Sequence, residues 1–100
     1  MPEIPETVVI VTEALEGAAV QRWGRLIAGA VDLRPASLII DLRACPLVDA
    51  AALAVLLWAH REVVADGGRL TLRSPRDKVR RILRLARLEH VFEIDAGVPA

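Results

Sequence analysis

Hydrophobic residues recur along this chain in two alternating patterns, one typical of strands and one typical of helices. Residues 7–12 (TVVIVT) are β-branched throughout and predict a strand that is covered on both faces. Residues 18–31 repeat apolar side chains at a helical spacing and predict the first helix. After a loop at 33–37, the buried strand predicted at 38–42 (LIIDL) precedes a second helix from 50 to about 65.

The last third of the chain continues the alternation. Residues 69–73 (RLTLR) alternate polar and apolar side chains, which predicts a strand with one polar face. Ser74 as N-cap and Pro75 at the first helical position then predict the start of a helix over 76–87. The residues that this helix is expected to bury are Val79, Ile82, Leu83 and Ala86. Residues 88–94 predict a turn and a short closing strand.

This order of elements predicts one small α/β domain. Strands that alternate with helices of this length favour right-handed crossovers, and therefore a mixed, mostly parallel sheet of about four strands flanked by helices. We expect the domain to span residues 7–94, with a flexible lead-in at 1–6 and a tail at 95–100.

The helix predicted from residue 50 has two apolar faces at about 100° per residue. The face expected to lie on the sheet contains Leu53, Leu56, Leu57, His60 and Val64. The opposite face contains Ala51, Val55, Trp58 and Glu62. Apolar residues on an outer face indicate either a second covering layer or a docking surface, and a domain of this size favours docking.

The start of this helix is the strongest candidate site. Asp49 has the character of an N-cap, since its carboxylate can accept from orphan N–H groups of the first turn. A junction between a parallel strand and a helix is also where open α/β sheets bind ligands. Asp49 as a helix cap alone is the structural alternative to a role in partner contact.

The residues around this junction carry a family pattern. Asp41-Leu42, then Val48-Asp49-Ala50-Ala51-Ala52-Leu53 and Leu56, resemble the motif D-L-x-x-x-x-x-[IVM]-D-S-[ST]-G-[LI]-x-x-L of STAS domains. In the switchable members of that family the second hydroxyl residue after the aspartate is the phosphoacceptor. That position is Ala51 here, and Ala52 replaces the following glycine. The chain therefore resembles a STAS domain, of the anti-sigma-factor-antagonist kind, that lacks the phosphoacceptor.

The resemblance implies a regulatory binding module. Its implied partner is an anti-sigma factor of the serine-kinase type, which would be bound constitutively because Ala51 cannot be phosphorylated. The partner-binding residues expected are Asp49, Ala50, Ala51, Ala52, Leu53, Val55, Trp58 and Glu62. Two alternatives remain: a constitutive STAS subunit on the ATPase of an ABC-type lipid or solute transport complex, and a domain that has lost the interaction and persists as a self-associating remnant, a homodimer formed through an open sheet edge.

Composition narrows the function further. Thirteen cationic and thirteen anionic side chains cancel, so nothing global favours nucleic acid or an anionic membrane. The Arg-rich face of 78–87 is either a solvated surface or a site for an acidic partner or a nucleotide phosphate. The longest apolar run, at 50–59, is too short to span a membrane, and we expect a cytoplasmic protein.

Catalysis and metal binding find little support in the sequence. Asp41 and Asp49 could pair as acid and base, but no nucleophile, cofactor motif or metal spacing accompanies them. His60 and His90 lack partners at ligand spacing, and the single Cys45 is expected to be a buried, inert thiol. We therefore predict no enzymatic activity, no cofactor and no metal.

Overall fold

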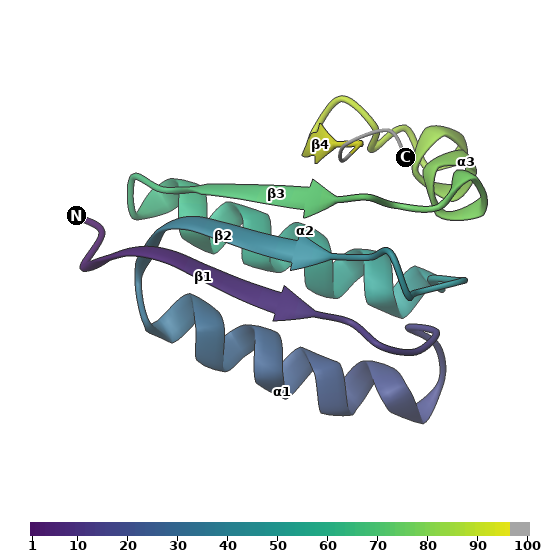
Figure 1. Ribbon diagram of the computed structural model, residues 1–100, viewed down its shortest axis with the longest axis horizontal. Coiled ribbons are helices and arrows are strands. Elements are labelled where there is room, and N and C mark those ends of the chain that lie inside the picture. Colours follow the sequence, from purple (N-terminus) through teal and green to yellow (C-terminus); the bar gives the residue numbers. More distant parts are fainter. Residues whose placement is uncertain (97–100) are drawn as a thin grey trace.

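A computed structural model describes residues 1–96 and contains one parallel sheet with helices between its strands. The strands are β1 (Ile4–Ile10), β2 (Pro35–Asp41), β3 (Arg69–Arg73) and β4 (Glu93–Asp95), and the helices are α1 (Ala18–Asp32), α2 (Ala50–Ala65) and α3 (Asp77–Leu85). The strands lie in the order β1-β2-β3-β4 and every neighbouring pair is parallel (Figure 1). The predicted small α/β domain is confirmed, and its described sheet is entirely parallel rather than mixed.

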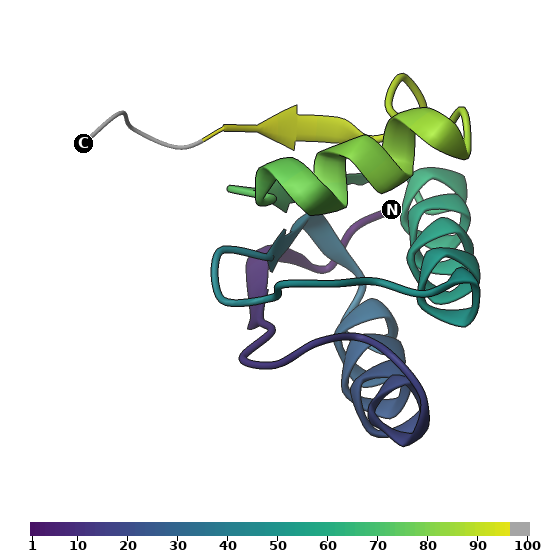
Figure 2. The same cartoon turned by 90° about the vertical axis from the view of Figure 1, so that its right-hand side faces the viewer.

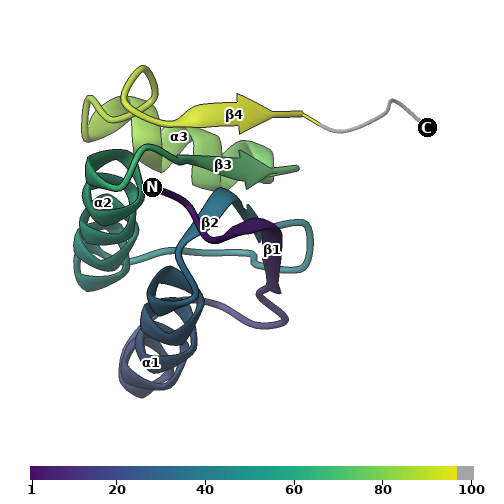
Figure 3. The same cartoon turned by 90° about the vertical axis from the view of Figure 1, so that its left-hand side faces the viewer.

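The helices leave one of the two faces of the sheet uncovered. Helices α1 and α2 lie side by side against one face, while α3 lies beyond the carboxyl end of β3 (Figures 2 and 3). No helix among residues 1–96 covers the other face. The sheet therefore has a helix-covered face and an open face.

The first strand differs from the prediction in both extent and cover. It begins at Ile4, within the segment expected to be a flexible lead-in, because the Glu3 N–H donates to the Arg34 carbonyl at 2.8 Å. The prediction that this strand is covered on both faces is wrong: Val8 is 38% and Ile10 is 56% exposed. Their side chains lie on the open face, at the edge of the sheet, where no described helix reaches.

Two other boundaries move for reasons of tertiary packing. Strand β2 begins at Pro35, inside the predicted loop, because Pro35 pairs with Ile4 at the start of β1. The N-cap of α3 is Arg76, with no side-chain capping bond, so the predicted cap at Ser74 is wrong. Ser74 instead has a left-handed φ of 53° and donates its N–H to the Asp95 carbonyl. Of the predicted tail, residues 97–100 lie outside the described chain.

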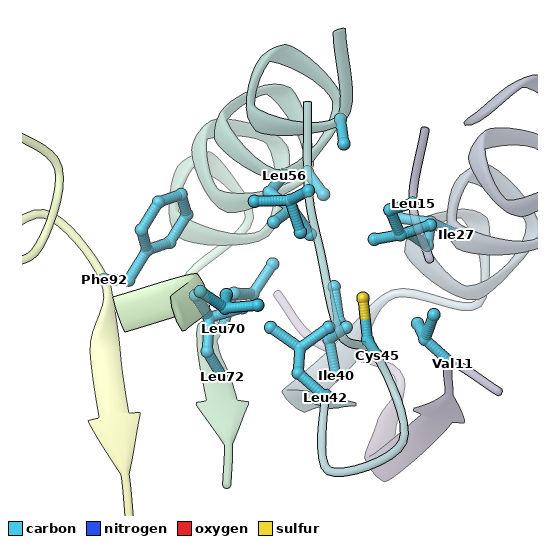
Figure 4. Packing of buried hydrophobic residues seen from close by; sticks show 14 of the residues in the cluster. Val11, Leu15, Ile27, Ile40, Leu42, Cys45, Leu56, Leu70, Leu72 and Phe92 are labelled. Carbon is cyan, nitrogen blue, oxygen red and sulfur yellow. The ribbon is translucent and has the colours of Figure 1, made fainter. Parts of the chain in front are cut away.

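The core lies between the sheet and the helices α1 and α2. Leu56 of α2 points toward the side chains of Leu42 and Leu70, and Phe92 closes the cluster on the side of β4 (Figure 4). Ile27 contributes to the same core from α1. Burial of such side chains contributes about 1.5–3 kcal/mol each to folding.

Helix α2 meets the core through a different line of residues from the one predicted. Its buried residues are Ala52, Leu56, Ala59 and Val63. Only Leu56 belongs to the predicted core face, and Val64, which was expected against the sheet, is 49% exposed. Small residues on the buried line allow the helix backbone to approach the sheet closely, which leaves the bulkier Leu53 and Leu57 at its margins.

Candidate partner-binding site

Asp49 joins the first turns of the two helices that cover the sheet. Its Oδ1 accepts the N–H of Ala52 at 2.8 Å, which confirms the predicted N-cap of α2. Its Oδ2 accepts the N–H of Gly17, the N-cap of α1, at 3.0 Å. The bonds from Ala52 and then from Gly17 lower the pKa of Asp49 below its ordinary value. The carboxylate thus fixes the position of both helix starts.

The charge on Asp49 is expected to make stability depend on pH. Because the pKa is lower in the folded protein than the ordinary 3.8, its stabilisation is complete above pH 3.8 and is lost as pH falls through the folded value. We expect Asp49→Ala to lower Tm by a few degrees at pH 7, and the difference from wild type to shrink in acid. Thermal melts at pH 7 and pH 2.5 measure this. A difference that stays constant between them would contradict a role for the charge.

Asp41 holds the loop that leads to this junction. Its Oδ2 pairs with the Arg73 Nη2 at 3.1 Å, and its Oδ1 accepts the Arg43 N–H at 2.9 Å. Burial opposes ionisation, but the bonds from Arg43 and Arg73 outweigh it and lower the pKa of Asp41. The Arg76 Nε donates to the Arg43 carbonyl at 2.8 Å and secures the loop from α3. Asp41 and Asp49 thus each have their own partners, and the structure does not present them as an acid–base pair.

The three alanines that begin α2 differ in their surroundings. Ala50 and Ala51 are exposed, whereas Ala52 is only 1% exposed and packs in the core. The surface at the start of the helix therefore presents methyl groups on a fixed backbone. The side chain of Ala52 cannot contact a partner, although the sequence placed it in the site.

The outer face of α2 forms one wall of an apolar groove. Val55 is partly buried, while Trp58, at 41% exposed, and Glu62 remain at the surface. The groove has a volume of about 530 Å³ and lies at the surface where α2 packs beside α1. It is lined by Val20, Gln21, Gly24, Arg25, Ala28, Ala54, Val55 and Trp58.

The contribution of α1 to this groove was missed from the sequence. A Cβ added at Gly24 would lie 3.8 Å from the Cγ2 of Val55, so the two helices approach closely there. Gly24 and Ala28 are four residues apart and therefore lie on the same helix face. Two small residues at this spacing were the available signal for a close helix–helix contact.

The other polar candidates make packing contacts within the fold. Cys45 is buried, with its Sγ 3.3 Å from the Leu47 carbonyl. His60 meets the ring of Phe92 edge-on, at 5.5 Å between centroids. Within residues 1–96 no group of three potential ligands could hold a metal ion, and no helix there is long and apolar enough to cross a membrane.

Comparison with known proteins finds a matching family model and several solved structures with a similar fold. The family model of the STAS domain matches residues 1–99. A putative anti-sigma factor antagonist, TM1081 from Thermotoga maritima, superposes with a TM-score of 0.82 at 21% identity, over 96% of this chain and 85% of that one. The anti-sigma factor antagonist SpoIIAA in its unphosphorylated form gives 0.77 at 21% identity, over 94% and 83%. The phosphorylated form of SpoIIAA, described as a Bacillus cell fate determinant, gives 0.69 at 20% identity, over 94% and 86%. No curated protein matches the sequence.

Proposed function

Because the chain belongs to the STAS domain family, we propose that it is a regulatory binding module, not an enzyme, which binds an anti-sigma factor of the serine-kinase type without a phosphorylation switch. The similarity of its fold to SpoIIAA, described as an anti-sigma factor antagonist, and to TM1081, described as a putative one, supports a role in regulatory protein binding. The proposed contact surface comprises the exposed start of α2 and the groove beside Trp58.

Ala51 carries this proposal. It lies exposed in the first turn of α2. The resemblance of residues 48–56 to the family motif implies that this is the phosphoacceptor position of switchable STAS domains. No serine or threonine occurs between Arg43 and Asp66, and the chain contains no tyrosine. A phosphate would add nearly two negative charges at this surface, and without an acceptor that change is not available. The module would therefore remain in its binding form.

Restoring the hydroxyl tests this idea. With an anti-sigma factor kinase that binds the protein, wild type is expected to give no phosphopeptide within residues 44–61. Ala51→Ser should gain a phosphate and release the kinase, because the new side chain is exposed where the charge would meet the partner. Ala65→Ser, an exposed position at the far end of the same helix and outside the groove, is the matched control and should remain bound. Mass spectrometry and a binding assay before and after ATP addition measure both effects, and phosphorylation of wild type in this segment would refute the proposal.

The apolar groove also supports a second candidate partner, the ATPase of an ABC-type transport complex. A constitutive interface needs no charge switch, and the groove presents Trp58 beside small apolar residues. The two candidates differ in the protein that is bound. Affinity purification from the native source, followed by protein identification, should recover either a kinase-type anti-sigma factor or an ABC ATPase. Recovery of neither class would contradict both assignments.

A further inference from the structure

The outer edge of β1 is unpaired within residues 1–96, and it carries exposed apolar side chains. Strand β1 pairs only with β2 in the described sheet. Val8 and Ile10 lie on the open face, and Val8 is in register with the partly buried Ile39 of β2. An open strand edge with apolar side chains is a template for pairing with another strand.

The hydrogen-bonding groups of this edge follow from the register of β1. The Val11 N–H donates to the Asp41 carbonyl at 3.0 Å, toward β2. Because alternate residues of a strand direct their backbone groups to the same side, Thr7 and Val9 also bond to β2. The N–H and carbonyl groups of residues 6, 8 and 10 therefore point away from the sheet.

We propose that a second copy of this chain occupies the edge, with the two β1 strands antiparallel about a two-fold axis at Val8. This register opposes Val8 to Val8 of the second copy, and Glu6 to Ile10. It supplies roughly six backbone hydrogen bonds, two for each opposed pair. The Val8 and Ile10 side chains of both copies then lie on the same open face, beside Ile39. The two sheets become one continuous sheet.

Charge selects this register from its neighbours. A shift that centres the pairing on Glu6 would place the two Glu6 carboxylates directly opposite one another, which is destabilising. In the register centred on Val8 they stand about 13 Å apart, beyond the Debye length of about 8 Å in physiological salt. Glu3 is already paired with Arg34 at 2.9 Å.

Substitution of an exposed apolar side chain on the β1 edge should weaken self-association, whereas the same substitution at a similarly exposed position elsewhere should not. By sedimentation equilibrium, wild type is expected to form a dimer that dissociates on dilution. Ile10→Lys should weaken the dimer at least about tenfold, since lysine on an edge strand opposes pairing. Leu26→Lys is the matched control, because Leu26 is 58% exposed on α1, away from this edge. A monomer at millimolar concentration, or equal loss in both variants, would overturn the proposal.

Amide hydrogen exchange provides an independent measurement that needs no substitution. The amides of Glu6, Val8 and Ile10 should gain protection as the protein concentration rises. Those of Thr7, Val9 and Val11 should be protected at every concentration, because β2 already accepts them. A dimer in which residues 6, 8 and 10 exchange as fast as in the monomer would refute this interface. The proposed dimer does not depend on the proposed function. Both experiments use the purified chain alone, so their outcome is independent of any binding partner.

Discussion

Trp58→Asp is expected to abolish capture of the partner while the fold remains intact. Trp58 forms the wall of the apolar groove between α1 and α2, and 41% of its surface is available for contact. Removal of a tryptophan that anchors an interface typically costs about 2–4 kcal/mol of binding free energy, which corresponds to about 30- to 1,000-fold weaker binding. An aspartate at this position also places a charge in an apolar groove. Affinity purification with quantitative protein identification measures the effect.

Two variants separate the groove from general damage to α2. Val64→Asp introduces the same residue on the same helix, at a side chain with 49% exposure that does not line the groove. It should bind as wild type does. Ala54→Arg fills the groove from an exposed position and removes no packed side chain, so it should weaken binding without loss of stability. Equal binding by Trp58→Asp and wild type would move the docking surface elsewhere, with the Arg-rich face of α3 as the next candidate.

Gly68→Ala is expected to destabilise the fold by about 1–3 kcal/mol, which is a large effect for one added methyl group. A Cβ at this position would lie 2.5 Å from the carbonyl oxygen of Pro35 and 3.0 Å from that of Ala36. Both oxygens belong to the backbone of β2, and no side-chain rotation can relieve the contact. The loss corresponds to a Tm lower by about 4–8 °C for each kcal/mol. Urea denaturation measures it.

Gly29→Ala is the matched control for this substitution. Gly29 is an exposed residue within α1, and a Cβ there would meet no atom within 4 Å. Alanine in a helix interior is more stable than glycine by about 0.5–1 kcal/mol, so this variant should be more stable than wild type. The same substitution is thus expected to act with opposite sign at the two positions. Two variants of equal stability would show that β2 can move away from Gly68.

Features that depend on residues close together along the chain could be predicted from the sequence. The boundaries of α2 follow from Asp49 at its start and from Gly67 at its end, which has a left-handed φ of 87°. Strand β3 lies where its alternation of polar and apolar residues predicts. The order of elements likewise predicted the α/β domain, because strands joined by helices of this length favour parallel pairing.

The missed features depend on contacts between segments far apart in the chain. The second bond of Asp49 is made to Gly17, 32 residues away, and no local pattern predicts it. Helix α2 is apolar around most of its circumference, so its periodicity could not determine which line of residues meets the sheet. The groove required the orientation of α1 against α2.

The kind of each element, the cap of α2 and the absence of a hydroxyl at Ala51 could be predicted from the sequence, because they depend on residue identity or on contacts within a few positions. The edge position of β1, and the burial of Ala52 next to the exposed Ala51, arise from packing between distant segments. A β-branched run reads the same at the edge and at the centre of a sheet. Which of its faces is covered depends on where the distant helices pack.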